Sequence, residues 1–597
     1  MSGAGTTGDA TTGATGAITP GGAIARTALG GTATAGTRQL VRLALRRDRI
    51  MIPVWVAALG LTIASVARSL SALYGTAAER ADLTRSLRGD SSLRALYGPV
   101  FTDSVGGLTA WRTVGFGAGL AAVMSLLIVV RHTREEEETG RQELLSSAMV
   151  GRRAPLTAAL LTALTANTAL AAVITAGLAA SGQDIAGSLA LALAIAGVGT
   201  LFACTAAITA QITGSARLAK GLALAAIGAA YLLKAAGDAS SDNGSSVLTW
   251  LSPLGWAENT RAFAGERWWV LLLLAAAIVA QATVAYALAG RRDLGMSFVA
   301  ARPGPAVGGL GTAGALAWRL QRGSLAGWGA GFLLAGAVFG AVTDSAADLA
   351  GGDEGIRRII ERMGGANGGP GGLGGPGGLG GLGGLGGLGG AADGGAHEGL
   401  TAAFLATTVS MLGMVAALYA VASVLRLYGE ETGGRAEPVL AGAVGRLRWA
   451  GGHLLIAFGG AGPVMLLGGV GLAAGYGRDL PAILGACLVQ LPAIWVLGAS
   501  AVLLYGVVPR AAVAGWAVAG AVLALGWIGP ALGLPRRVMD LSPFGHLPKL
   551  PSAAGAAGAG GAAGTEMAWA PVLTLTAIAV VLVATGLAGL RRRDMLS

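Results

Sequence analysis

The sequence "RHTREEEETGRQELLSSAMVGRR" at Arg131–Arg153 follows a long apolar run, and "RLYGEETGGRAEPVLAGAVGRLR" at Arg426–Arg448 repeats its pattern after another apolar run. In each copy two glutamates precede a glycine–arginine pair and a further glutamate. The matched positions are Glu136, Glu137, Gly140, Arg141 and Glu143 in the first copy, and Glu430, Glu431, Gly434, Arg435 and Glu437 in the second. This duplication predicts a chain built from two related halves.

Two further matches occur in the same order along the chain. The sequence "LSPLG" contains Leu251, Ser252 and Pro253, and "LSPFG" contains Leu541, Ser542 and Pro543. The triplet "RRD" then occurs at 291–293 and again at 592–594. Each match lies before or after the last apolar run of its half. If each half holds six spans, both halves run the same way, and a pseudo-twofold axis lies along the membrane normal.

The composition indicates a membrane protein. The chain is 53% hydrophobic and only 12% charged, whereas soluble domains carry roughly 25% charged residues. Apolar runs of 18 or more residues recur, and their continuity favours helices over barrel strands. We therefore predict an all-α polytopic protein with twelve transmembrane helices in two pseudo-symmetric six-helix halves. The spans are expected near residues 50–72, 109–130, 155–180, 186–212, 217–236, 268–290, 325–345, 400–425, 449–474, 482–508, 511–533 and 570–590.

The predicted boundaries follow from these spans. Residues 1–37 are expected to form a disordered cytoplasmic tail, 38–293 the first half, 294–324 a cytoplasmic linker and 325–597 the second half. Within the second half, residues 346–399 form a glycine-rich external loop. Arginine gathers in the segments on one side of the predicted membrane, which places both termini in the cytoplasm of a plasma-membrane protein.

Several classes of function are disfavoured. The two cysteines lie inside apolar runs and the four histidines are scattered, so neither a disulfide framework nor a metal site is expected. The net charge of +11 fits arginines at cytoplasmic helix ends better than nucleic-acid binding. Lys220, Lys234 and Lys549 follow Ala, Leu and Pro, so the chain lacks a Gly-Lys-Ser/Thr phosphate loop. No catalytic residue is predicted.

The duplicated acidic pattern suggests a docking surface. On a continuous helix Glu136, Gly140 and Glu143 would share one face, and Glu137 would pair with Arg141 four residues on. The same spacing holds from Glu430 to Glu437. The alternative is a charged helix that only ends a span, although acids are unfavourable beside an anionic cytoplasmic leaflet. Two such sites suit a twofold-symmetric partner.

These residues resemble the ABC transporter permeases of actinobacteria that are described as exporters of polyketide antibiotics or multidrug efflux permeases. The resemblance covers roughly residues 38–597. It implies a separate ATPase subunit, present in two copies, which carries ATP and magnesium and docks on the ten matched residues of the acidic repeat. It also implies that the "LSP" segments cap an external gate. For these segments a turn with interfacial tryptophans is an equal alternative.

The sequence therefore predicts the permease subunit of an ATP-driven exporter. Its expected partners are the ATPase, membrane lipid and an amphipathic small molecule, with no nucleic acid. Pro438 stands where the first copy has Leu144, so the two docking sites are expected to be unequal. Two alternatives remain open. An ion-coupled secondary transporter is disfavoured by the few ionisable residues within the spans, and a membrane scaffold or immunity protein would act without transport.

Overall fold

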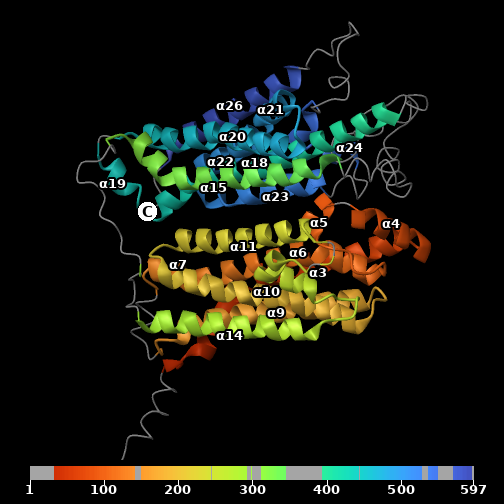
Figure 1. The fold of residues 1–597 in the computed structure, drawn as a ribbon. Helices are drawn as coiled ribbons and strands as arrows, with labels where there is room; N and C mark the ends of the chain where they lie inside the picture. Colours follow the sequence, from red (N-terminus) through yellow and green to blue (C-terminus); the bar gives the residue numbers. More distant parts are fainter. Residues whose placement is uncertain are drawn as a thin grey trace, which may run out of the picture. The chain divides into compact units, whose positions relative to one another are not determined.

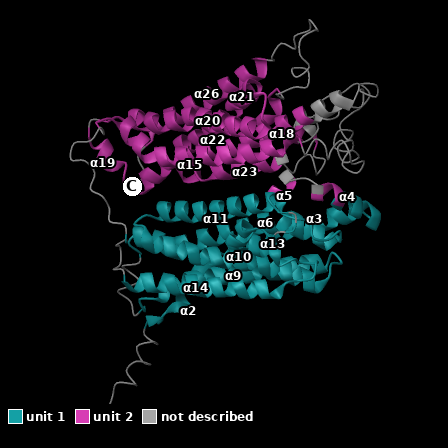
Figure 2. Ribbon diagram, viewed as in Figure 1, with its two compact units in different colours: residues 1–84, 97–302 teal, residues 85–96, 303–597 magenta. Residues whose placement is uncertain are grey.

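The computed structural model describes residues 33–89, 91–141, 150–241, 243, 245–291, 298, 311–344, 393–442, 444–527, 535–548 and 569–593. Every regular element in these ranges is helical (Figure 1). The chain divides into two compact units, residues 1–84 with 97–302 and residues 85–96 with 303–597 (Figure 2). Residues 1–32 of the predicted tail and 346–392 of the predicted glycine-rich loop lie outside the described residues, as does most of the 294–324 linker.

Eleven helical segments in the described residues are long and apolar enough to cross a membrane. The first unit contributes α3 (Met51–Leu73), α6 (Val105–His132), α9 (Ala154–Ala179), α10 (Ile185–Ile212), α11 (Ala216–Ala239) and α14 (Trp268–Arg291). The second contributes α15 (Ala313–Ala341), α18 (Asp393–Thr432), α20 (Arg446–Tyr476), the consecutive pair α21 (Leu480–Val489) and α22 (Leu491–Val507), and α26 (Trp569–Arg592). The prediction of an all-helical, multi-span chain is confirmed.

The first unit is organised around α6 and α10. Of the most apolar stretch of each helix, 72% is buried in α10 and 67% in α6, against 17% in α14 and 22% in α11. The centre is lined by small residues such as Ala118, Ala121 and Ala194, which allow the helix backbones to approach closely. Shorter elements in this unit are α2 (Thr37–Arg47), the first part of α4 (Ala77–Gly89), α7 (Arg134–Glu138), α12 (Val247–Leu251) and α13 (Pro253–Asn259). Residues 85–96, which include most of α5 (Ser91–Tyr97), group with the second unit.

In the second unit, glycines bring α15 and α20 into direct backbone contact. A Cβ added to Gly336 would lie 2.1 Å from the Gly468 carbonyl oxygen, and one added to Gly471 would lie 2.1 Å from that of Leu333. This is the small-residue packing typical of membrane helices, where close approach maximises van der Waals contact. Shorter elements here are α19 (Glu437–Leu440), η2 (Pro509–Ala511), α23 (Ala514–Trp527), α24 (Arg536–Met539) and η3 (Pro543–His546).

Two predicted spans differ from the observed helices. The span expected at 511–533 corresponds to α23, which has 14 residues and is shorter than the roughly 20 residues a membrane crossing needs. A twelfth span therefore stays a prediction. The span expected at 325–345 begins earlier, because α15 starts at Ala313, where the sequence predicted linker. The polar residue Gln321 lies within the added helical turns, and its side chain is buried, with Nε2 2.9 Å from His453 Nδ1 on α20.

Candidate functional site

The first acidic segment, residues 134–141, follows the end of α6. Just before it, the buried carboxylate of Asp48 binds His132 Nε2 at 2.6 Å and Arg131 Nη1 at 2.8 Å. Asp48 lies between α2 and α3, so these contacts join the end of α6 to the start of α3. Helix α7 then carries the four consecutive glutamates.

Each of the four glutamates contacts its own unit. Glu135 pairs with Lys220, and Glu136 pairs with Arg47 and, at 3.4 Å, with Arg141. Glu137 Oε2 lies 2.5 Å from Arg134 Nη1. Glu138 Oε1 accepts a hydrogen bond of 2.8 Å from the backbone N–H of Ala216 at the first residue of α11, where a carboxylate also complements the helix dipole. The acidic run therefore fixes α7 to α2 and α11.

The second acidic segment, residues 430–440, is held in the same manner by different partners. Glu430 Oε2 accepts from Arg435 Nε at 2.8 Å. Glu431 has a side chain only 1% exposed and receives two guanidinium hydrogen bonds from Arg593, of 2.7 and 2.8 Å, together with a hydrogen bond from the Tyr505 hydroxyl. Burial alone would lower the pKa of Arg593, but the Glu431 carboxylate outweighs burial and raises it. Glu431 thus ties the end of α18 to α22 and to the end of α26.

The predicted helix face through the glycines is wrong in both copies. Gly140 has φ +70° and Gly434 has φ +68°, so the backbone is left-handed at both positions. Helix α7 ends at Glu138 and α18 ends at Thr432. After α18 the Gly434 N–H bonds to the Glu431 carbonyl and the Arg435 N–H to the Glu430 carbonyl, the hydrogen-bond pattern of a glycine-terminated helix.

The predicted charge pairs also change with that turn. Arg141 reaches Glu136 instead of Glu137, and Arg435 reaches Glu430 instead of Glu431, because a left-handed glycine removes the four-residue helical spacing. Pro438 lies in the first turn of α19, as its chemistry requires. Glu143 and Leu144 lie outside the described residues.

The charged side chains that remain exposed on the two acidic segments carry both signs. The Arg141 side chain is 52% exposed and that of Arg435 is 63% exposed, and Glu138 and Glu437 are exposed as well. Glu137 and Glu431, by contrast, face their own unit with side chains 9% and 1% exposed. A partner that approached these segments would meet the glycine turns, the two arginines, Glu138 and Glu437 before it met Glu137 and Glu431.

The two "LSP" segments share a local design. Leu251 and Leu541 are 62% and 72% exposed. The buried residues Ser252 and Ser542 then precede Pro253 in the first turn of α13 and Pro543 in the first turn of η3. Ser252 accepts from the Leu254 N–H and donates a 2.7 Å hydrogen bond to the Ala230 carbonyl on α11. Beside the first segment, Trp250 stacks on Trp269 with ring centroids 5.5 Å apart, so interfacial aromatics also contribute here.

A buried charged cluster in the first unit was missed by the sequence analysis. Lys234 Nζ lies 2.7 Å from Glu258 Oε1 and 3.3 Å from Asp238 Oδ2. The Asp238 carboxylate also accepts a 2.8 Å hydrogen bond from Thr249. Burial, together with the charge of Asp238, raises the pKa of Glu258 on α13 to about 8, against the opposing effect of Lys234. The four-residue spacing of Lys234 and Asp238 at the end of an apolar run was the available signal.

Membrane-length helices in two bundles, with a helix-ending turn that recurs after α7 and α18, define a polytopic α-helical membrane protein. The family described as "Multidrug efflux system permease Rv1217c, C-terminal domain" matches residues 38–292, 310–370 and 390–591, and the chain belongs to this family. It is 39% identical over 575 residues to the multidrug efflux system permease protein Rv1217c of Mycobacterium tuberculosis (strain ATCC 25618 / H37Rv), which covers 95% of this chain and 96% of that protein. The resemblance to multidrug efflux permeases is confirmed.

Proposed function

We propose that this chain is the permease subunit of an ATP-driven ABC exporter in the plasma membrane, with its termini in the cytoplasm. Hydrolysis of ATP with magnesium would take place on a separate ATPase subunit present in two copies. The sequence supports this division of labour, since none of its lysines lies in a phosphate-binding loop. The relative that it matches along nearly its whole length is described as a multidrug efflux permease.

The observation that carries the proposal is the mechanical anchoring of the duplicated acidic segments. In the first unit, Glu138 holds the N-terminus of α11 and Glu136 holds α2 through Arg47. In the second, Glu431 holds α26 through Arg593 and α22 through Tyr505. A partner that displaces either segment therefore moves membrane helices with it, which is what a coupling element must do.

The docking contacts are assigned to the exposed part of each segment. Gly140 and Arg141 offer a backbone turn and a guanidinium in the first copy, and Gly434 and Arg435 do so in the second, where Glu437 is also exposed. Arginine forms bidentate hydrogen bonds with carboxylates, so acidic side chains on the ATPase suit both sites. The glutamates at 136, 137, 430 and 431 would not contact the ATPase. Through their contacts within each unit they would transmit its movement to the membrane helices.

The substrate class proposed is an amphipathic or hydrophobic compound, such as an antibiotic. The exposed leucines beside buried serines at 251–253 and 541–543 provide two apolar segments suited to close and open an external gate. This assignment relies on the family resemblance and on the shared local design of the two segments.

An ion-coupled carrier is the second candidate, and the Lys234–Asp238–Glu258 cluster favours it. Two carboxyl groups around one ammonium leave one proton to bind or release, and buried ionisable groups in membrane helices often mark proton pathways. Such a cluster also fits a purely structural role that joins α11 to α13.

Transport in inside-out vesicles distinguishes the two candidates. Vesicles that contain the full chain and its ABC ATPase should accumulate a fluorescent amphipathic dye when ATP is added. Orthovanadate should abolish this uptake, whereas a protonophore should leave most of it in place. Uptake that ignores vanadate and collapses with the protonophore would instead establish the ion-coupled carrier and refute the ATP-driven mechanism.

A further inference from the structure

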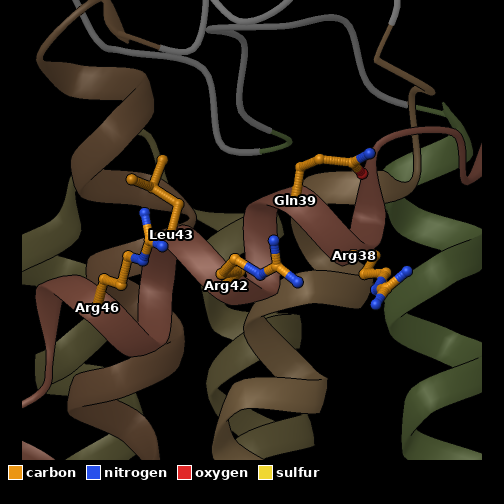
Figure 3. A pocket seen from close by; sticks show the side chains of 5 residues that line it. All are labelled: Arg38, Gln39, Arg42, Leu43 and Arg46. Carbon is orange, nitrogen blue, oxygen red and sulfur yellow. The ribbon is translucent and has the colours of Figure 1, made fainter.

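Helix α2 carries a row of arginines just before the first membrane-length helix. Arg38, Arg42 and Arg46 follow one another at four-residue intervals, so they lie along one face of α2 (Figure 3). The helix packs along α9 and buries Ala44, and α3 begins at Met51, only four residues after α2 ends. The arginine row therefore lies next to the point where the chain enters the membrane.

The three arginines lack any acidic partner among the described residues, and all three are exposed. Their neighbour Arg47 behaves differently, since it pairs with Glu136. Three uncompensated guanidinium groups within three helical turns create a strongly positive surface that attracts an anion.

The surface beside these arginines is hollowed on both sides. A hollow of about 310 Å³ is lined by the three arginines with Gln39 and Leu43 (Figure 3). A second, of about 740 Å³, is lined by the same arginines together with Val41, Leu45 and, from α9, Leu161. The larger hollow thus combines guanidinium groups at its rim with aliphatic side chains from two helices.

Guanidinium groups beside aliphatic side chains fit a ligand that combines an anionic group with a hydrocarbon chain. Arginine binds phosphate oxygens through two parallel hydrogen bonds, and aliphatic walls favour a hydrocarbon chain. Leu43 on α2 is 55% exposed and Ile50, between α2 and α3, is 71% exposed, as expected of a segment that rests on the membrane surface. We propose that α2 binds an anionic phospholipid, with the headgroup phosphate on Arg38, Arg42 and Arg46 and an acyl chain against Val41, Leu45 and Leu161.

The segment that precedes α2 offers a poor acidic occupant for this surface, because residues 1–36 contain Asp9 as their one acidic residue. A bound lipid would also act on the first acidic segment, since the next residue after the row, Arg47, holds Glu136. The lipid site stands independently of the ATPase and of the direction of transport.

Native mass spectrometry of the full chain in detergent tests the site. The probes are dioctanoyl phosphatidylglycerol, dioctanoyl phosphatidylcholine and inorganic phosphate, each titrated separately. The wild-type chain should bind the anionic lipid at least tenfold more tightly than the zwitterionic lipid, and phosphate alone should bind more weakly than either. Equal affinity for the two lipids, or phosphate binding as tight as that of the anionic lipid, would overturn the proposal.

Arginine-to-glutamine variants test whether the lipid binds at α2. Since each basic residue near an anionic lipid contributes about a fivefold gain in affinity, the triple variant R38Q/R42Q/R46Q should lose on the order of a hundredfold. The matched control R319Q/R448Q/R510Q removes the same charge from exposed positions elsewhere and should retain the wild-type affinity. Retained affinity in the first variant, or equal loss in both, would contradict the proposal. If the triple variant does not fold, R42Q alone decides: a loss of about fivefold supports the site, and unchanged affinity refutes it.

Discussion

The ammonium of Lys234 on α11 lies 2.7 Å from the Glu258 carboxylate on α13, with the two side chains 0% and 3% exposed. Because Asp238 also lies 3.3 Å from the same ammonium, Lys234 contacts two buried carboxyl groups. This contact joins a membrane-length helix to the segment that precedes α14. It could not be predicted from the individual apolar runs, because each run lacks information about its neighbours.

Removal of the cation should destabilise the first unit strongly. The substitution Lys234→Met takes the ammonium away from two buried carboxyl groups, and such a loss costs about 3–5 kcal/mol in comparable buried pairs. The free energy of unfolding in mixed micelles, measured by titration with SDS, provides the test. The matched control is Lys220→Met, whose ion pair with Glu135 is about one-third exposed and should be worth less than about 1 kcal/mol. Equal losses in the two variants would contradict the role of burial.

The stability of the protein should fall as the pH rises toward 8. The pKa of Glu258 is raised to about 8 by burial, so the folded state holds this proton where the unfolded state has released it. The stabilisation is complete below the ordinary pKa of 4.5 and is lost as the pH rises through the folded value. Melting temperatures between pH 5 and pH 9 should decrease in the wild type. They should change less in Glu258→Gln, which carries no titratable group; an unchanged pH profile would refute the assignment.

The Glu431–Arg593 contact should hold the end of α26. The substitution Glu431→Gln removes the charge that accepts both guanidinium hydrogen bonds, and loss of such a buried partner costs about 3 kcal/mol. Hydrogen exchange at residues 586–593 should accelerate in this variant. Glu437→Gln, an exposed position in the same segment, serves as the control and should change exchange there little. If both variants exchange alike, Glu431 does not anchor α26.

Charge reversal at the exposed arginines should weaken ATPase binding. The variants Arg141→Glu and Arg435→Glu present a carboxylate where the proposed partner supplies one, and each should lower co-purification of the ATPase at least fivefold. The Arg141→Gln and Arg435→Gln variants, neutral counterparts of the same size as the glutamates, should lose less, because they remove attraction without adding repulsion. Unchanged co-purification in the double charge-reversal variant would exclude these residues from the interface.

The contact between α15 and α20 should tolerate no side chain at Gly471. A Cβ there would meet the Leu333 carbonyl oxygen at 2.1 Å, so Gly471→Ala forces the two backbones apart and should cost roughly 1–3 kcal/mol. Gly459→Ala, on the same helix with no atom within 4 Å, is the control and should be neutral or slightly stabilising. Unfolding in SDS compares the two variants directly, and equal stability would mean that the helices can separate without cost.

Some features of this protein follow from local sequence alone. An apolar run of membrane length must satisfy its backbone within itself, so the helices around α6, α10, α20 and α26 could be predicted without knowing what they touch. The recurrence of Gly140 and Gly434 likewise marked two related segments, and both glycines adopt the same left-handed turn. Sequence spacing could not reveal that turn, because a glycine inside a helical pattern and one that ends a helix look alike.

The partners of the charged residues were decided only by the tertiary structure. Glu431 and Arg593 are separated by 162 residues, and Gln321 and His453 by 132. Each contact depends on how two helices are rotated about their axes and shifted along them when they pack. The sequence of a single apolar run does not determine these quantities. Tertiary packing therefore turned the acidic residues, expected on the surface, into anchors that face their own unit. It left the arginines of α2 and of the two turns to face outward.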